Sequence, residues 1–200
     1  KLYKEADEIL NFPLSKLILE GPKDQLDLTE NTQPAIFLVG YSIFRLINEH
    51  HKIDIKKSKF YAGHSLGEYT ALACAGALSF SDTLKILKIR GKAMQEAVPR
   101  GEGGMLAILG SDIGRIDKIL KENEKNFECF IANDNSDNQL VVSGSNENIQ
   151  KFSDFLNIKK IKNIKLPVSA PFHCKLMNNA TKVMEKEIKK LEFKNFENAL

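Results

Sequence analysis

The order of elements expected between residues 103 and 168 is the feature that most constrains the fold. Gly103 opens the apolar strand MLAIL, and Ser111 or Asp112 caps a helical segment, IGRIDKILKEN. FECFIA and QLVVSG are predicted strands joined by a loop of Asn and Asp, and they precede the helix NIQKFSDFLN and the strand IKNIKLPV. These assignments rest on apolar periodicity and on flanking cap residues. The resulting order, β-α-β-β-α-β, is the split βαβ arrangement of ferredoxin-like sheets.

The segments outside this insert are mainly helical. Short helices are predicted over residues 1–11 and 13–20, and a buried helix over 32–50 that Pro34 starts. A Lys- and Glu-rich helix is predicted from about residue 175 to 191.

Residues 1–102 and 169–200 are therefore expected to form one large subdomain that the small subdomain, 103–168, interrupts. The one convincing strand of the large subdomain is Phe60–Ala62. Because a parallel sheet cannot be built from one strand, its partner strands are expected outside this sequence. The chain also starts without Met and closes at ENAL, so we expect a sequence truncated at both ends.

Composition argues against several classes of function. Lys and Arg total 29 and Asp and Glu 26, and the net charge of +3 gives no argument for nucleic-acid binding. No apolar run is long enough to span a membrane, and the start KLYKEADEIL lacks the apolar core of a secretory leader. Cys74, Cys129 and Cys174 have no CxxC spacing, which fits neither zinc nor a disulfide framework. A reducing, cytoplasmic compartment is expected.

The stretch AGHSLGE places Ser65 between Gly63 and Gly67, after the predicted strand and before an apolar helix at 69–77. GxSxG between a strand and a helix is the signal of a nucleophile elbow. The following helix N-terminus can stabilise an oxyanion, with the Leu66 N–H as the natural donor. The alternative is a Gly-flanked turn in which the serine only caps a helix.

A serine hydroxyl needs a base to act as a nucleophile. His50 and His51 end a predicted helix and are expected at the surface. The side chain of His64 should leave the turn in a different direction from that of Ser65. His173 lies in the loop SAPFHC, where a histidine is more often structural. Paired with a candidate elbow, it becomes the favoured base.

Arg90 is a charge in an apolar setting. Ser79 and Asp82 form a capping signal for the helix TLKILKIRGKAMQEA, and Arg90 lies on or beside the apolar face of that helix. The positions four residues away are Ile86 and Met94, not acids. A buried arginine needs an anionic partner, and an external carboxylate would satisfy it bidentately. The alternative is an arginine whose head group reaches water.

The motifs GHSLGE, RGKAMQEAVP, GGMLAILG, NDNSDNQLVVSG and SAPFHC, with TQPAIFL upstream, resemble the malonyl-CoA:acyl carrier protein transacylases of fatty-acid synthesis. The resemblance runs through nearly all of the chain in one order. It implies an α/β fold: an α/β-hydrolase-like large subdomain, incomplete here, with an inserted ferredoxin-like small subdomain. The family's FPGQGSQ segment, which supplies a second oxyanion amide, and its C-terminal segment are absent from this sequence.

By resemblance, Ser65 corresponds to the acyl-accepting nucleophile and His173 to its general base. Arg90 is similar to the arginine that pairs with the malonyl carboxylate, and the Leu66 amide to one half of the oxyanion hole. Further substrate-binding positions implied by the resemblance are Gln33, Met94 and Asn133.

The implied reaction is malonyl transfer from malonyl-CoA to the phosphopantetheine thiol of acyl carrier protein through a malonyl-serine. Because the coenzyme A thioester is a substrate, no cofactor and no metal are expected. The expected partners are malonyl-CoA and acyl carrier protein, without nucleic acid or membrane. The expected enzyme is a monomer in the cytoplasm, or in an organellar stroma or matrix of a eukaryote.

Two other functions fit parts of the sequence. A serine esterase would need an acidic residue between the serine and the histidine. Every Asp considered for that role lies in the insert, and an esterase leaves Arg90 unexplained. An inactive fragment that binds a carrier protein is the second alternative.

Overall fold

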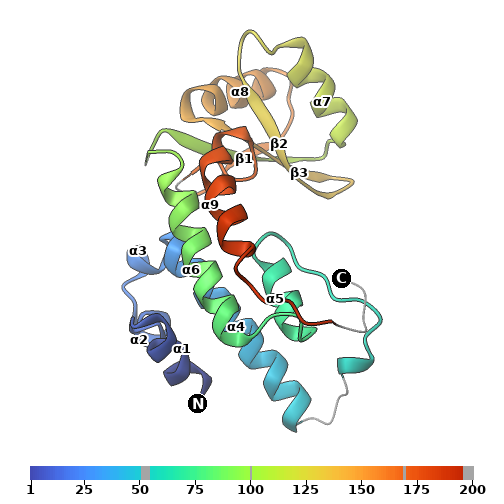
Figure 1. Cartoon of the computed structure of the whole chain (residues 1–200). Helices are drawn as coiled ribbons and strands as arrows, with labels where there is room; N and C mark the ends of the chain where they lie inside the picture. Colours follow the sequence, from blue (N-terminus) through green and yellow to red (C-terminus); the bar gives the residue numbers. More distant parts are fainter. Residues whose placement is uncertain (51–54, 100, 169, 196–200) are drawn as a thin grey trace. The chain divides into compact units, whose positions relative to one another are not determined.

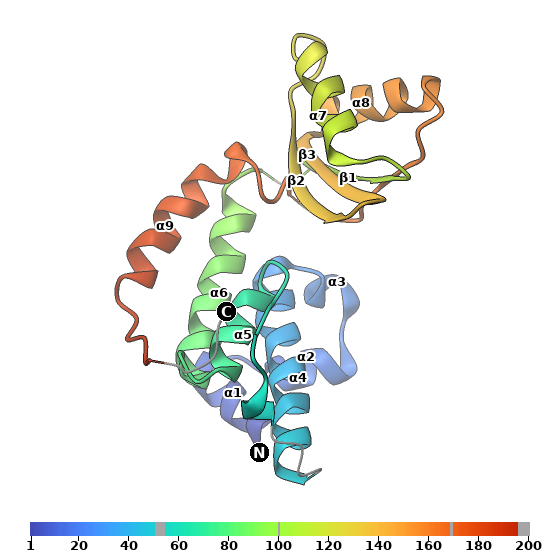
Figure 2. The same cartoon turned by 90° about the vertical axis from the view of Figure 1, so that its right-hand side faces the viewer.

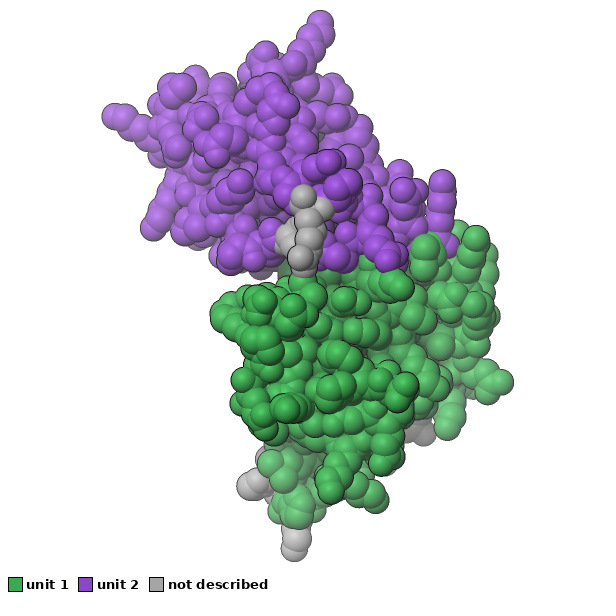
Figure 3. Space-filling model, turned by 90° about the vertical axis from the view of Figure 1, so that its left-hand side faces the viewer, with its two compact units in different colours: residues 1–92, 183–200 green, residues 93–182 purple. Residues whose placement is uncertain are grey.

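The structure is a computed structural model that describes residues 1–50, 55–99, 101–168 and 170–195. It divides into two compact units, one of residues 1–92 with 183–200 and the other of residues 93–182 (Figure 3). The predicted insert, 103–168, falls wholly within the second unit, which also takes in residues 93–102 and 169–182.

The second unit contains a four-stranded sheet in the order β2-β3-β1-β4 (Figure 1). Its elements are β1 (Gly103–Leu109), α7 (Ile113–Glu122), β2 (Cys129–Ser136), β3 (Gln139–Ser145), α8 (Asn146–Ile158) and β4 (Asn163–Lys165). All three strand pairs are antiparallel, with Gly103 opposite Ser145 and Ala107 opposite Ile164. This confirms the predicted β-α-β-β-α-β order and the ferredoxin-like sheet.

The pleat of β1 sends alternate side chains into two separate cores. Leu106 and Ile108 are fully buried among apolar residues of α7 and α8, which cover the same face of the sheet (Figure 2). Met105 and Ala107 pack on the opposite face, against Val141 and apolar residues of the segment 166–172. The sheet is therefore covered on both faces, and the segment that carries His173 begins as part of the second cover.

Two strands differ from the prediction. The Asn- and Asp-rich segment expected as a loop is the second half of β2, because Asn133, Asp134 and Ser136 all pair with β3. Register shifts between Ile131 and Asn133, and again between Asp134 and Ser136, accommodate these residues in the strand. The last strand, β4, is only three residues long.

The first unit is built from helices. They are α1 (Leu2–Leu10), α2 (Leu14–Glu20), α3 (Lys23–Leu26), α4 (Thr29–His50) and α5 (Gly67–Cys74). Most of α6 (Phe80–Glu96) and the end of α9 (Asn178–Ile188) also belong to this unit. Their shared core includes Phe37 and Leu38 of α4 with Leu84 and Leu87 of α6. The predicted strand Phe60–Ala62 is reduced to a single β-bridge at Phe60. Among the described residues, none of these helices combines the length and apolarity needed to cross a bilayer.

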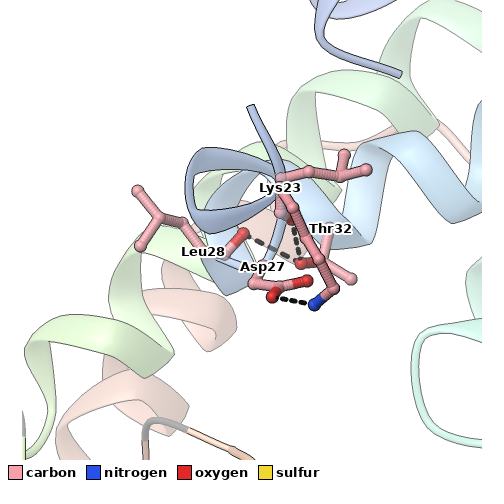
Figure 4. Close-up of polar contacts among 5 residues, drawn as sticks. Lys23, Asp27, Leu28 and Thr32 are labelled. Carbon is pink, nitrogen blue, oxygen red and sulfur yellow. Dashed lines mark hydrogen bonds and ion pairs between the residues drawn. The ribbon is translucent and has the colours of Figure 1, made fainter. Parts of the chain in front are cut away.

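Helix α4 starts three residues before the predicted Thr32, and Pro34 lies inside it. Before Pro34, Thr32 Oγ1 donates to the carbonyl oxygen of Leu28 (3.0 Å), and Lys23 pairs with Asp27 in the preceding short helix (Figure 4). The Thr32 contact stabilises an extra first turn upstream of the proline, whereas the exposed Lys23–Asp27 pair belongs to the preceding helix. The extra turn begins at Thr29.

Helices α4 and α6 are in backbone contact at Gly91. A β-carbon placed on Gly91 would lie 2.4 Å from the carbonyl oxygen of Thr29 and 2.4 Å from Cα of Glu30. On the same face of α6, Lys88 Nζ donates to Asn31 Oδ1 (2.7 Å) and lies 3.7 Å from a Glu30 carboxylate oxygen. Only glycine permits this approach, so Gly91 fixes the first turn of α4 against α6.

We predict that Gly91→Ala destabilises the protein by about 1–3 kcal/mol, because the new methyl group must displace backbone atoms of α4. Gly40→Ala is the matched control, since a β-carbon there meets only Thr70 Cγ2, at 3.9 Å. In a helix interior, this control should be neutral or stabilising by up to about 1 kcal/mol. Urea unfolding measures both variants, and equal stabilities would contradict the role of Gly91.

Candidate functional site

Ser65 lies in a sharp turn immediately before α5. Its φ is 54°, in the left-handed region. Two backbone hydrogen bonds close the turn. The Gly67 N–H donates to the carbonyl oxygen of His64 (2.9 Å), and the Glu68 N–H donates to the carbonyl oxygen of Ser65 (3.3 Å). The half-buried serine therefore stands at the start of a helix, as the elbow motif predicts.

The two glycines of the motif have different structural roles. A β-carbon on Gly63 would lie 1.9 Å from both the carbonyl carbon and the oxygen of Gly67, whereas one on Gly67 would meet nothing within 4 Å. Gly63 is thus required for the turn to close on itself. A β-carbon is therefore excluded at Gly63 but tolerated at Gly67.

Positive φ angles at residues other than glycine are rare and often mark functional sites. Among the described residues they occur at Asn11, Ser65, Lys160 and His173. Asn11 caps the C-terminus of α1, and Lys160 follows the C-cap of α8, where left-handed residues are common. Ser65 and His173 do not follow helices, so their strained backbone points to a function.

Arg90, on α6, reaches two of the candidate residues. Its Nη2 donates to Ser65 Oγ (3.3 Å), and its Nη1 donates to Gln33 Oε1 (2.7 Å). The guanidinium carbon lies 5.8 Å from the centre of the Tyr69 ring, a cation–π distance. The structure therefore brings together Ser65, Arg90 and Gln33, and adds Tyr69, which the sequence analysis did not single out.

The Arg90 guanidinium is half-buried, and its surroundings shape two pKa values. Burial lowers the pKa of Arg90, against the opposing effects of Tyr69 and Glu68, but an arginine remains cationic in a protein. Burial also raises the pKa of Tyr69, and this outweighs the lowering by Arg90. The site therefore holds a fixed positive charge next to a neutral phenol and the Ser65 hydroxyl.

His173, in the second unit, belongs to a loop tied to the sheet. Ser143 Oγ donates to the carbonyl oxygen of Phe172 (2.5 Å), and a β-carbon on Gly103 would lie 2.1 Å from the Pro171 ring. His173 is exposed, and its backbone φ is 59°. A histidine held in a left-handed conformation on an anchored loop is suited to present its side chain outward.

The other candidate substrate-binding residues lie in an apolar cluster and in a strand of the sheet. Met94 is 7% exposed, in an apolar cluster with Ala170 and Met177. Asn133 is half-buried in β2, directly after the first register shift. Their substrate-binding roles remain predictions. His50 and His64 are exposed, and His51 lies outside the described residues.

The thiols are poor rivals to Ser65 as nucleophiles. Burial raises the pKa of Cys74 to about 11 and, with lesser contributions from Cys174 and Glu128, raises that of Cys129 to about 12. Burial likewise raises the pKa of Cys174. Because the thiolate is the reactive form, these cysteines stay protonated and unreactive near neutral pH.

Comparison with known proteins assigns the family. The model of the acyl transferase domain matches residues 4–198. The chain belongs to the acyl transferase family. The malonyl CoA-acyl carrier protein transacylase of Bacillus subtilis (strain 168) is 39% identical over 197 residues, which are 98% of this chain and 61% of that protein.

Solved structures agree with this acyl transferase assignment. The acyl-carrier-protein S-malonyltransferase of Bartonella henselae superposes with a TM-score of 0.91 at 39% identity, covering 98% of this chain and 62% of that one. A malonyl-transacylase in complex with a type II polyketide acyl-carrier protein gives a TM-score of 0.91 at 35% identity, covering 98% and 63%. The fold is thus that of the malonyltransferases, α/β-hydrolase-like with a ferredoxin-like part. The chain spans about 61% of the length of the curated relatives it matches.

We predict that Gly63→Ala disrupts the elbow of this acyl transferase domain and lowers its thermal stability, since the methyl group would overlap the Gly67 carbonyl. Gly67→Ala is the matched control and should unfold within a few degrees of the parent, because its methyl group enters open space and alanine favours a helix. Differential scanning fluorimetry compares the two. Equal melting temperatures would contradict this account of the turn.

Proposed function

We propose that the protein transfers a malonyl group from malonyl-CoA to the phosphopantetheine thiol of an acyl carrier protein, through a malonyl ester of Ser65. The observation that carries the proposal is the 3.3 Å contact between Arg90 Nη2 and Ser65 Oγ. The names of the relatives support it: they are malonyl CoA-acyl carrier protein transacylases, and one solved relative is in complex with an acyl-carrier protein.

The position of Arg90 suits a malonyl group in particular. In malonate, a single methylene separates the free carboxylate from the thioester carbonyl that Ser65 would attack. A guanidinium within hydrogen-bonding distance of the serine oxygen can therefore also reach the carboxylate of an acyl group on that oxygen. Arginine binds carboxylates through paired N–H donors, so Arg90 would select acyl groups that carry a free acid.

In the first half-reaction, Ser65 Oγ attacks the thioester carbonyl as His173 takes the hydroxyl proton. The carbonyl oxygen becomes an oxyanion that the Leu66 N–H stabilises at the start of α5. When the carbon–sulfur bond breaks, coenzyme A leaves with a proton as the free thiol, and malonyl-Ser65 remains.

In the second half-reaction, the phosphopantetheine thiol of the carrier attacks the serine ester. His173 takes the thiol proton and then returns a proton to Ser65 Oγ as the ester bond breaks. The products are malonyl-carrier and free enzyme, so the cycle is ping-pong. We propose that it needs neither a metal nor an organic cofactor, and that the protein works as a monomer in the cytoplasm.

A serine esterase is the competing activity, because the elbow alone would serve it equally well. The two functions differ in their use of Arg90: an ester substrate without a free acid gives the guanidinium no partner. A carrier-binding module without catalysis is the second competitor, and it differs in forming no covalent intermediate.

We predict that the protein mixed with malonyl-CoA gains the mass of one malonyl group on the peptide that contains Ser65. Ser65→Ala should gain none, and Gly67→Ala serves as a folded control. Intact-protein and peptide mass spectrometry make the measurement. A parent protein that binds malonyl-CoA without forming an adduct would favour the binding module.

We predict that Arg90→Ala lowers kcat/KM for malonyl-CoA about tenfold to a hundredfold, since hydrogen bonds to charged groups contribute about 1.5–3 kcal/mol. Loading of acetyl-CoA should be unchanged or improved. Arg90→Lys is the matched control: it keeps the charge without the planar fork and should lie between the parent and Arg90→Ala. Equal losses for malonyl and acetyl groups would argue for an esterase-like site.

A further inference from the structure

The side chain of Gln33 connects Arg90 to a buried hydroxyl. Gln33 is 2% exposed; its Nε2 donates to Thr29 Oγ1 (3.0 Å), and its Oε1 accepts from Arg90 Nη1 (2.7 Å). Thr29 is itself 8% exposed. Thr29 and Gln33 lie four residues apart on α4, on the same face of the helix. A continuous chain of hydrogen bonds therefore runs from Thr29 through Gln33 and Arg90 to Ser65.

The donors and acceptors of this chain permit one direction only. Arginine has five N–H donors and no acceptor, so the Gln33 amide must turn its oxygen toward Arg90. The NH2 end of the amide then faces Thr29, whose hydroxyl must accept. Without that hydroxyl, the buried NH2 group would lose this hydrogen bond, and the amide would lose the contact that favours this orientation. The Thr29 hydroxyl thus holds the amide in the orientation that Arg90 needs.

The backbone around Thr29 is also fixed with respect to Arg90. Gly91, the next residue after Arg90, allows α6 to contact the Thr29 carbonyl directly. Lys88, three residues before Gly91 on α6, donates to Asn31 Oδ1 in the same first turn of α4 (2.7 Å). Thr29 is therefore a fixed support rather than a mobile neighbour.

We propose that Thr29 is a positioning residue for carboxylate recognition. Its hydroxyl orients the Gln33 amide, the amide occupies Nη1 of Arg90, and the guanidinium then directs Nη2 toward the acyl group on Ser65. This inference rests on the proposed malonyl transfer. It assigns to a buried threonine outside the predicted helix a part in the choice of acyl group.

The test compares Thr29→Val, which keeps the shape without the hydroxyl, with Thr29→Ser, which keeps the hydroxyl. Thr29→Val should lower kcat/KM for malonyl-CoA about 2- to 10-fold, as expected for the loss of one hydrogen bond, and leave acetyl loading within about twofold. Thr29→Ser should behave like the parent. Equal losses on both substrates, or the same loss in Thr29→Ser, would make Thr29 merely structural and overturn the proposal.

A double-mutant cycle provides the second arm. If Thr29 acts through Gln33, Thr29→Val should add nothing to the malonyl-specific defect of Gln33→Leu. Additive effects of the two substitutions would overturn the proposal.

A third measurement separates this proposal from the proposed function. In the ligand-free protein, NMR should show the Gln33 side-chain NH2 exchanging slowly with solvent in the parent and in Thr29→Ser, and faster in Thr29→Val. A parent that loads no malonyl group refutes the proposed function, yet the exchange rates still test the hydrogen bond. Unchanged exchange in Thr29→Val would refute the positioning role even in an active enzyme.

Discussion

The guanidinium of Arg90 is the charge around which the polar interior of the first unit is arranged. Because it cannot be neutralised, its partial burial has to be compensated by nearby dipoles. The Gln33 amide, the Ser65 hydroxyl and the Tyr69 ring, all neutral groups, supply part of that compensation, and the charge of Glu68 adds a favourable Coulomb interaction. Because these three contacts are with neutral groups, the cation keeps a capacity to bind an anion.

Close backbone approach supports this arrangement. Two glycines permit this close approach. Gly63 lets the turn at Ser65 fold back on the first residue of α5, and Gly91 lets α6 contact the first turn of α4. Helix α4 contributes Gln33 and Thr29 to the site, α5 contributes Tyr69 and the turn before it, and α6 contributes Arg90. Since interiors are packed as densely as organic crystals, a change of one methyl group at either glycine is felt at the guanidinium.

Much of this could be predicted from the sequence, and the failures have physical causes. Apolar periodicity and the caps at Ser79 and Asp112 predicted most elements, and the β-α-β-β-α-β order followed. The predicted start of α4 was wrong. Pro34 favours the first turn of a helix, but the Thr32 hydroxyl bonds carbonyl oxygens upstream, and the helix begins earlier. Strand pairing likewise overrode the loop preference of the Asn- and Asp-rich segment. The bonds at the start of α4 are local but concern residues upstream of the proline, whereas the strand pairing is a tertiary effect that leaves no local signal.

The candidate site was predictable only in part, because its residues come from distant parts of the sequence. An arginine beside an apolar face implied a partner, but periodicity cannot say which one, because Arg90 and Gln33 are 57 residues apart. Thr29 lay outside the predicted helix, so its position four residues before Gln33 carried no meaning until the extra turn was known. The turn at Ser65 followed from the motif, whereas the positive φ of His173 had no signature in the sequence.

The division of the chain has a consequence for biosynthesis. One unit is continuous, residues 93–182, whereas the other combines residues 1–92 with residues 183–200, joined by contacts such as the N–H of Lys194 donating to the Ala77 carbonyl (2.9 Å). A ribosome delivers the continuous unit as one block, and domains fold as units during synthesis. The discontinuous unit can close only after that block has emerged. Residues 1–92 are therefore synthesised well before residues 183–200, with which they share contacts such as the one between Ala77 and Lys194.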